Sequence, residues 1–593
     1  MSPHASFSTN QHPFQGVPPA PTPTPLPQFR EFRRPLSDNE LYDYCFYFSH
    51  PFGLTRASCR SYFLPSRAEG LNDVLLHLDV RSPASLITPD RLAIVWAITR
   101  LRHTLIASRI ILPPGQYDKA YFSYIPPSNP THALNEAKLT FSVYRDRTID
   151  QHIESFMNDK RPHLSWDQLS SYAFIPPSHP VDASSSKVED FTLIFCAKHC
   201  IGDGISMHHV MAEFLATLGG LDGTTGAHRT MAQLTELLDH EWSRRWASQT
   251  VLGFEPVTSP TEARMPSANS RLQAAAHKVE FLKNQETFIG GHTIPRARAA
   301  TFKNVSPDIT YDRRQTAAIV AKCKARGVTV SNTLFVLCNF AWTRTIRARA
   351  LLGDRSFAPE TLPVMMYTAV NLRPYSSNER VALPGSYFFL SLTYFNVVLP
   401  SFLPSASSLA STFWHRSRSV RAQQKKYLKS PMLIGRTQTM NLERGARSRV
   451  WAKEDDDILA GVSTTPSPPA VAVAPKPDPT LTPAAPAAAS APPWSLPPPP
   501  TMALVGLTLL GDLDDIYPAA AYPDFEFGRI ASFTRKTKGK MLLLAHTFRG
   551  KFFIQLGWDV NGFREGLVEE FWARILNGVD EFLLDQDPVL ARL

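Results

Sequence analysis

The residues best suited to chemistry are a histidine and an aspartate four positions apart, His199 and Asp203, with a glycine on each side of the aspartate. A dense apolar run of strand length precedes them at residues 188–197, and residues 205–218 follow with helical spacing. An imidazole held where a strand gives way to a helix can reach into a cleft and accept a proton near neutral pH. The pattern predicts a general base at His199; from spacing alone, the alternative is a structural loop held by a hydrogen bond to Asp203.

The elements that must position this pair read as a mixture of helices and strands along the chain. Apolar patterning predicts strands at residues 71–80, 138–144, 188–197, 364–372, 391–399, 503–510, 539–548 and 552–559. Helical spacing predicts helices at residues 90–108, 205–218, 312–326, 331–347 and 564–584. We therefore expect a mixed α/β protein in two halves, without an internal repeat.

Two compositionally biased segments interrupt this pattern. Residues 1–33 are rich in Pro, Thr, Gln and Ser, and residues 463–501 are rich in Pro and Ala. Neither segment can bury enough apolar surface to offset the entropy of ordering, so we expect a disordered N-terminal arm and a disordered insertion. The predicted domains are then an N-terminal lobe at 34–260, which contains the His199 motif, and a C-terminal lobe at 261–593 that carries the insertion.

Composition argues against several classes of protein. The 593 residues carry a net charge of +10, but Lys and Arg are scattered among Asp and Glu, so nucleic acid is not an expected partner. The most apolar long stretch, residues 386–404, is interrupted by polar residues and a proline, which predicts strands rather than a membrane span. The six cysteines show no C-x-x-C spacing and mostly have apolar neighbours, which predicts reduced, buried thiols of an intracellular protein.

Four further stretches accompany the His199 motif in order. Residues 96–108 read W-A-I-T-R-L-R-H-T-L-I-A-S, residues 370–374 read V-N-L-R-P, residues 383–384 read L-P, and residues 394–400 read Y-F-N-V-V-L-P. Together with H-x-x-x-D-G at His199, they resemble the ordered motifs of the chloramphenicol-acetyltransferase-like superfamily, which includes plant BAHD acyltransferases, fungal alcohol acetyltransferases and condensation domains. The resemblance spans residues 34–590 apart from the insertion.

This resemblance implies an α/β fold of two lobes, each a mixed sheet with flanking helices, and an active site in the tunnel between them. It implies that His199 takes the proton of an acceptor hydroxyl as that oxygen attacks the thioester of acyl-CoA. Acyl-CoA is then a co-substrate, no cofactor is permanently bound, and no covalent acyl-enzyme forms. Asp203 and Gly204 are implied to be structural, with Arg373 as the partner of the Asp203 carboxylate. Asn396 is implied to donate to the developing oxyanion.

For two of these roles, the residues by themselves also allow an explanation without function. Arg373 could equally be a surface arginine, and Asn396 could equally be a strand residue that satisfies neighbouring backbone groups. Two positions also depart from the superfamily's patterns. Condensation domains have a further histidine just before the catalytic one, where this chain has Lys198, and the plant D-F-G-W-G motif is matched only by D-F-E-F-G at residues 524–528. The chain is thus nearer to fungal acyltransferases than to either of those relatives.

Three lysines are candidates for binding the phosphates of CoA, foremost Lys536 and Lys538. With Lys540 they lie in R-K-T-K-G-K, and lysine binds phosphate as a point charge. The alternative is a solvated hairpin turn. His208 and His209 follow the His199 motif, but no H-E-x-x-H or carboxylate spacing surrounds them, so no metal site is predicted.

The leading hypothesis is an acyltransferase that moves an acyl group from CoA to a hydroxyl of a small molecule or glycolipid in fungal secondary metabolism. Residues 591–593, A-R-L, resemble a C-terminal peroxisomal address, which predicts a peroxisomal import receptor as a partner, with the cytoplasm as the alternative location. This combination resembles the peroxisomal acyltransferases of smut fungi that build mannosylerythritol lipids. A condensation-type enzyme with a carrier-bound acyl donor and a degenerate fold serving as an interaction module are the alternatives. Acceptor, acyl length, regiochemistry and oligomeric state are not encoded in these motifs.

Overall fold

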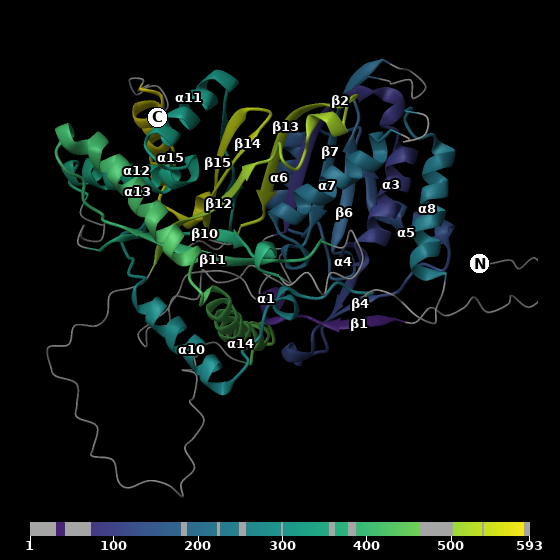
Figure 1. The fold of residues 1–593 in the computed structure, drawn as a ribbon, viewed down its shortest axis with the longest axis horizontal. Helices are drawn as coiled ribbons and strands as arrows, with labels where there is room; N and C mark the ends of the chain where they lie inside the picture. The colour runs from purple at the N-terminus through teal and green to yellow at the C-terminus, as the bar shows by residue number, and fades with distance from the viewer. Residues whose placement is uncertain are drawn as a thin grey trace, which may run out of the picture.

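Two mixed sheets with flanking helices lie side by side in the computed structural model (Figure 1). The structure describes residues 31–41, 73–179, 187–221, 226–247, 256–297, 301–354, 362–376, 387–462, 502–536 and 539–585. The predicted insertion at 463–501 and the A-R-L terminus lie outside these residues, as do Cys45 and Cys59. Within the described ranges, no helix combines the length and the apolar character needed to cross a membrane.

The first sheet has the strand order β13-β2-β7-β6-β5. Its strands are β2 (Val74–Pro83), β5 (Phe141–Val143), β6 (Ser170–Ile175), β7 (Val188–Ala197) and β13 (Glu526–Thr534). The central pair, β2 and β7, is antiparallel and buried along most of its length, because helices cover both faces of the sheet. This is why their sequences read as apolar runs rather than as a strict alternation.

Helices cover the two faces of this sheet unequally. On one face, residues of α3 (Pro89–Arg102), α5 (Pro130–Leu139), α7 (Gly204–Gly219) and α8 (Met231–Trp246) pack with Leu76, Leu78 and Phe195 into a large core (Figure 1). On the other face, α6 (Ile149–Asn158) packs with Leu75, Ile194 and Cys196 into a smaller core. Successive residues of β2 and β7 therefore serve different cores.

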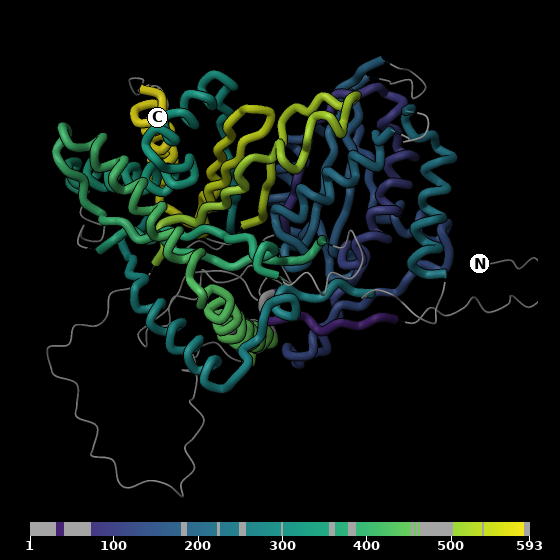
Figure 2. Tube along the Cα trace, viewed as in Figure 1, coloured from purple at the N-terminus to yellow at the C-terminus, as the bar shows by residue number. Residues whose placement is uncertain are grey.

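The second half of the chain also contributes a strand to the first lobe. Strand β13 pairs antiparallel with β2, with Thr534 opposite Val74, although its sequence lies far beyond the predicted domain boundary at 260. Figure 2 shows this segment, in yellow-green, lying beside the blue strands of the first half. The second half of the chain therefore supplies one edge strand to the first lobe's sheet.

The second sheet has the strand order β11-β10-β12-β14-β15-β8, and β9 also pairs with β15. Its strands are β8 (Asn304–Val305), β9 (Asp308–Tyr311), β10 (Val364–Asn371), β11 (Leu392–Leu399), β12 (Ala503–Asp512), β14 (Met541–Phe548) and β15 (Lys551–Asp559). The pairs β10/β12 and β12/β14 are parallel and the others are antiparallel. One face is covered by α11 (Arg313–Ala325), α12 (Val330–Leu351), α13 (Leu409–Leu428) and α15 (Leu567–Val579).

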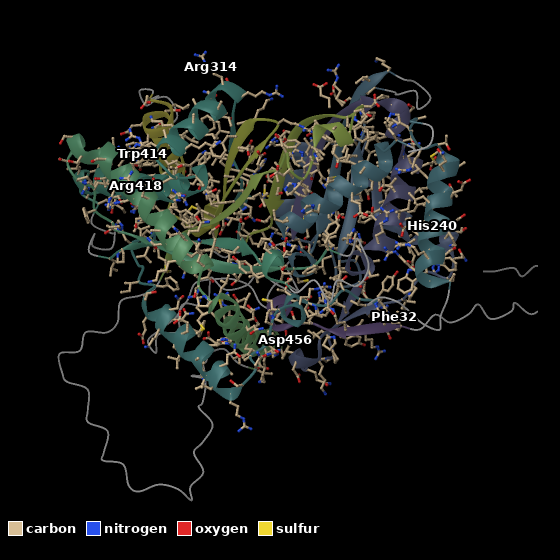
Figure 3. All side chains as sticks on the ribbon, in the orientation of Figure 1. Phe32, His240, Arg314, Trp414, Arg418 and Asp456 are labelled. Carbon is tan, nitrogen blue, oxygen red and sulfur yellow. The ribbon has the colours of Figure 1, made fainter. Side chains whose placement is uncertain are left out.

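Two further helices lie below the sheets in Figure 1 and tie the halves of the chain together. Helix α10 (Arg271–Glu286) packs on α14 (Leu433–Leu459), and α14 continues to the first lobe. There Arg449 pairs with Asp38 of α1 (Asp38–Leu41) at 2.6 Å, and Asp456, labelled in Figure 3, accepts a hydrogen bond from Tyr117 at 2.5 Å.

Small elements complete the first lobe. Strands β1 (Phe32–Pro35), β4 (Tyr121–Tyr124) and β3 (Arg109–Ile111) form a separate sheet, and the short helix α4 (Thr104–Ala107) follows α3. The N-terminal arm predicted at residues 1–33 overlaps β1, because Phe32 and Arg33 belong to that strand and pair with β4. In the same strand, the Arg34 guanidinium packs over the Phe122 ring of β4. Residues 1–30 of that arm lie outside the described residues.

The predicted helices and strands are confirmed as to type, with shifted ends. The helix predicted at 90–108 breaks at His103, and the strand predicted at 138–144 shrinks to β5 because its first residues finish α5. The mixed α/β class is confirmed. Cys196, Cys200, Cys323 and Cys338 are free and buried, as the sequence predicts.

Candidate active site

His199 lies on a cavity of about 360 Å³ that is bounded by both lobes. The first lobe contributes His199, Asp203 and Gly204, and the second lobe contributes residues of β10, β11, β12 and β14. Much of the second lobe's lining is apolar, including Leu392, Leu507, Leu542 and Leu544. The cavity thus combines one titratable imidazole with walls suited to a hydrocarbon chain.

The loop that carries His199 is fixed by its neighbours. Strand β7 ends at Ala197, and a single 3₁₀ turn, His199–Ile201, follows before α7 begins at Gly204. Cys200 and Ile201 are buried in the core of the first lobe. Because those two side chains point inward, the turn leaves His199 half-buried at the cavity wall.

Gly202 is required by a close approach rather than by its torsion angles. Its φ is −169°, which any residue can adopt, but a Cβ built there would lie 2.6 Å from Cζ of Phe388. Phe388 is itself buried in the first lobe's core, so its ring has little room to move. A Cβ on Gly204 would lie 3.0 Å from Leu510. Both glycines therefore allow the two lobes to approach beside His199.

Asp203 joins the two lobes and points its carboxylate away from solvent. Its Oδ1 accepts from the backbone N–H of Ser206 at 3.0 Å, which caps α7, and from Nη1 of Arg373 at 3.0 Å. Its Oδ2 accepts from the backbone N–H of Ser391 at 2.8 Å. With these donors, the carboxylate is held as a brace and is not left available as a second base.

Arg373 reaches Asp203 from the second lobe, just after β10. Besides the ion pair, its Nη2 donates to the backbone carbonyl of Phe389 at 2.6 Å, and its guanidinium lies 4.9 Å from the centre of the Phe389 ring. Its side chain is only 18% exposed. The structure therefore places this arginine inside the contact between the lobes rather than on the surface.

The stretch at residues 96–108 supports the helix that follows the His199 loop. His103 is buried and lies 2.8 Å from the Glu213 carboxylate on α7, and Arg102 and Tyr387 also donate to that carboxylate. Burial raises the pKa of Glu213, but the hydrogen bonds from His103 and Tyr387 and the charge of Arg102 outweigh it, so the pKa falls to about 2. This motif thus fixes α7 against α3.

Lys198, directly before His199, points away from the cavity. Its ammonium pairs with Asp73 at 3.2 Å, and both side chains are at most 5% exposed. Burial raises the pKa of Asp73 to about 6, although the Lys198 ammonium opposes the rise. The position where condensation domains have a further histidine is therefore part of a buried ion pair here.

Of the three lysines predicted to bind phosphate, Lys536 lies on the cavity, and Lys538 lies outside the described residues. The Lys536 ammonium is 3.3 Å from the Thr534 carbonyl and 3.4 Å from the Ser306 hydroxyl. Burial lowers its pKa to about 7. The predicted alternative, a solvated turn, does not describe Lys536, which is buried; Lys540 also lines the cavity.

The structure does not bring Asn396 to His199. Asn396 lines a separate small cavity together with Tyr427 and Arg436, beneath α10 and α14. Leu392 and Tyr394 on the same face of β11 do line the His199 cavity. Each further step of two residues along a strand covers roughly 7 Å, which carries Asn396 past the end of that cavity.

Several polar residues of the His199 cavity were not singled out from the sequence. Asn371 at the end of β10, Thr508 on β12, Ser532 on β13 and Tyr367 on β10 all line it. Asn371 belongs to the V-N-L-R-P stretch at residues 370–374, and this motif is the sequence feature that could have identified it as a site residue. The hydroxyls of Thr508 and Ser532 lie in ordinary strand patterns, so only the folded arrangement identifies them.

His208 belongs to the protein interior. Its Nδ1 is 3.1 Å from the Tyr517 hydroxyl, and burial, helped by the neighbouring His546 and His209, lowers its pKa to about 3. A neutral imidazole packed against Tyr517 accounts for this residue without any ligand.

Comparison with solved structures identifies the fold. The chain is similar to the trichothecene 15-O-acetyltransferase TRI3 from Fusarium sporotrichioides, with a TM-score of 0.61 and 11% identity over 94% of this chain and 95% of that one. It is also similar to the EpoB cyclization-docking bidomain from Sorangium cellulosum, with a TM-score of 0.48 and 9% identity over 96% of this chain and 88% of that one. No protein-family model matches the chain, and no curated protein matches it by sequence. The likeness to TRI3 shows the two-lobed, chloramphenicol-acetyltransferase-like fold.

Proposed function

We propose that this chain is an O-acyltransferase that transfers an acyl group from acyl-CoA to a hydroxyl of a small molecule or glycolipid, with His199 as the general base. The observation that carries the proposal is the position of His199 on a cavity bounded by both lobes. The fold is shared with TRI3, an acetyltransferase by name, which supports the same class of reaction here. A histidine on a two-sided, partly apolar cavity suits proton removal from an alcohol.

The proposed reaction proceeds in two steps at the His199 imidazole. The acceptor hydroxyl gives its proton to the ring as its oxygen attacks the thioester carbonyl, which forms a tetrahedral oxyanion. The oxyanion then collapses to the ester, the C–S bond breaks, and the imidazolium returns the proton to the sulfur of CoA. The proton taken from the acceptor thus leaves on CoA, His199 returns to its neutral form, and no covalent bond to the protein forms.

The oxyanion needs a donor inside the cavity. Asn396, the residue that the resemblance implies, lies in the neighbouring cavity. Asn371, Thr508 and Ser532 line the His199 cavity and carry amide or hydroxyl donors, so we propose that one of these takes the role.

The choice of acyl donor tests the proposal most directly. We expect the purified chain to release CoA from acyl-CoA when a hydroxylated acceptor is present, and to give far slower release with the same acyl group on a carrier protein. Turnover only with the carrier-bound thioester would favour the condensation-type alternative. The buried pairing of Lys198 speaks against that alternative, because a second histidine is missing from the position before His199.

Lys536 is proposed to meet a phosphate of CoA in its charged form. Because burial lowers its pKa to about 7, the ammonium predominates below that pH and the neutral amine above it. We expect the Kd for CoA to rise by about five- to tenfold between roughly one pH unit below and one above that pKa, since a hydrogen bond to a charged group contributes about 1.5–3 kcal/mol.

In Lys536→Met, CoA binding should be weak at both pH values, as measured by calorimetry. Lys551→Met, which removes an exposed lysine at the start of β15, is the matched control and should keep the pH dependence. An unchanged pH dependence in Lys536→Met would contradict the role of Lys536.

The proposals on the acceptor class and on the location in the cell rest on the sequence alone. We propose a glycolipid acceptor and peroxisomal import through residues 591–593, which lie outside the described residues, because A-R-L resembles a peroxisomal address. A deletion strain should accumulate a compound that lacks one acyl group. Removal of Leu593 should redistribute the protein in the cell, and an unchanged distribution would exclude this address.

A further inference from the structure

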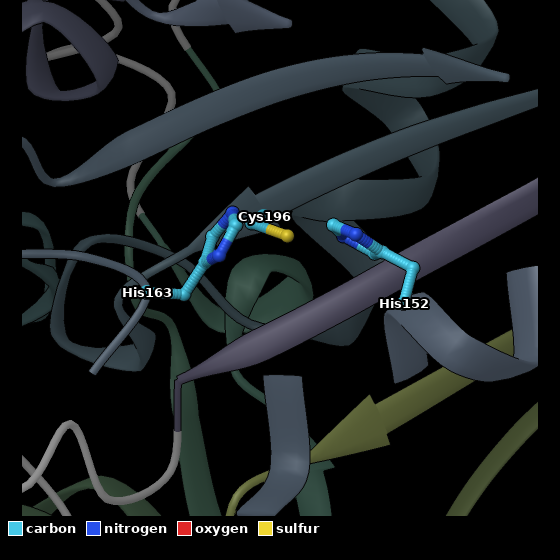
Figure 4. Close-up of side chains that lie close together, drawn as sticks. All are labelled: His152, His163 and Cys196. Carbon is cyan, nitrogen blue, oxygen red and sulfur yellow. The ribbon is translucent and has the colours of Figure 1, made fainter. Parts of the chain in front are cut away.

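Three side chains with metal-binding atoms meet on the face of the first sheet that is turned away from the large core. His152 lies on α6, His163 follows that helix, and Cys196 lies on β7 (Figure 4). Their ligand atoms, one nitrogen of each ring and the sulfur, all lie within 4.8 Å of one another. Figure 4 shows the two rings on opposite sides of the Cys196 sulfur.

The burial of His152 sets this cluster apart from ordinary packing. His152 is 2% exposed, and neither of its ring nitrogens has a hydrogen-bond partner. A buried polar atom without a partner costs about 1–3 kcal/mol, so such atoms are rare in folded proteins. Tyr144 and His163 contact the ring at centroid distances of 4.8 and 5.4 Å, but these contacts are aromatic and leave the nitrogens unsatisfied.

We propose that His152, His163 and Cys196 bind one Zn²⁺ ion. Two imidazoles and one thiolate form a donor set that suits zinc, whereas Mg²⁺ and Ca²⁺ prefer oxygen ligands. Zinc with bonds of about 2.1 Å to nitrogen and 2.3 Å to sulfur places tetrahedral ligand atoms about 3.3–3.6 Å apart. The three side chains therefore need to close by about 1 Å, which side-chain rotation supplies.

The surroundings provide a fourth position for the ion and contain one opposing charge. His163 is only half-buried, so water can reach the ion from its side and complete the tetrahedron. Ser171 lies directly opposite Cys196 across the β6/β7 pair, so its hydroxyl is on the same face of the sheet and can orient the sulfur. Arg147, whose guanidinium lies 4.8 Å from the centre of the Tyr144 ring, is a nearby positive charge that opposes the cation, and the Cys196 thiolate offsets it.

The ion would tie α6 and the segment after it to β7, three residues before His199. Cys196 packs with Leu75 in the smaller core, whereas Val74, the neighbour of Leu75 along β2, lines the His199 cavity. The zinc site and the cavity are therefore on opposite faces of one sheet. We expect the metal to stabilise the strand that presents His199 without contacting substrate.

Titration of the full chain with Co²⁺, after treatment with a chelator, tests the site without any activity assay. We expect one ion per chain and a near-ultraviolet charge-transfer band from thiolate to cobalt, which Zn²⁺ then displaces. Cys196→Ala should abolish the band, and His163→Gln should weaken binding by at least about tenfold, since even outer partners of metal ligands contribute that much. Cys338→Ala, which removes a buried thiol in the other lobe, is the matched control and should keep the band.

Absence of stoichiometric binding at micromolar Co²⁺ and Zn²⁺ would overturn the proposal, and so would a cobalt band that persists unchanged in Cys196→Ala. If Cys196→Ala does not fold, His163→Gln still tests the site, because His163 is half-buried and its replacement leaves the core intact. Wild-type affinity for the metal in His163→Gln would equally contradict the site.

Discussion

Replacement of His199 by alanine is expected to lower kcat/KM for acyl transfer by about a hundred- to ten-thousand-fold, the usual contribution of a positioned general base. The side chain lies at the cavity wall, whereas its neighbours Cys200 and Ile201 hold the turn in the core. Truncation at this half-buried position should therefore leave the fold intact. The loss should appear in kcat as well as in kcat/KM, since a base acts on the bound acceptor.

The measurement is a steady-state assay of CoA release with matched thermal unfolding curves. His240→Ala is the control, because His240 is exposed on α8 at the outer surface, as labelled in Figure 3. If His199→Ala retains activity within a factor of about three, His199 is not the base. If the product in cells is also unchanged, the fold serves as an interaction module instead.

Replacement of Asp203 by alanine is expected to lower the free energy of unfolding by about 3–5 kcal/mol, the range for removing one partner of a buried ion pair. The Arg373 guanidinium would lose its carboxylate, the backbone N–H of Ser391 would lose its acceptor, and α7 would lose its N-cap. Activity should fall as well, because the same loop carries His199. Chemical denaturation measures the loss in free energy of unfolding, which should appear as a lower denaturation midpoint of the variant.

The double variant Asp203→Ala/Arg373→Met separates an ion pair from two independent losses. Removal of both partners leaves no uncompensated buried charge, so the double variant should be destabilised by less than the sum of the single variants. Strict additivity, or a loss below about 1 kcal/mol in Asp203→Ala, would show that the two lobes are held by other contacts.

Local elements were predictable as to type, although not to their ends, because their type depends on neighbouring residues. The apolar run at β7 and the helical spacing after Asp203 define the strand-turn-helix unit around His199, and Asp203 caps that helix through its own side chain. Periodicity and caps act within a few positions, so they can be read from one sequence.

The positions of side chains relative to distant elements could not be predicted in the same way. Asn396 lies on a correctly predicted strand, yet the register of β11 and the cover of α10 and α14 put it in a different cavity from His199. Strand β13 pairs with β2 in the other half of the chain, which no local pattern indicates. Pairing partners of this kind depend on which apolar faces meet in the folded chain.

The sequence by itself determined the mixed α/β class and the strand-turn-helix unit that carries His199, because each of these is set by residues close along the chain. The structure added that the Asp203 side chain caps the helix. The tertiary structure alone decided that Lys536 is buried beside the cavity and that Asn371, Thr508 and Ser532 line it. It also decided that His152, His163 and Cys196 meet. Those groups lie far apart along the chain and come together only when sheets and helices bury their apolar faces against one another.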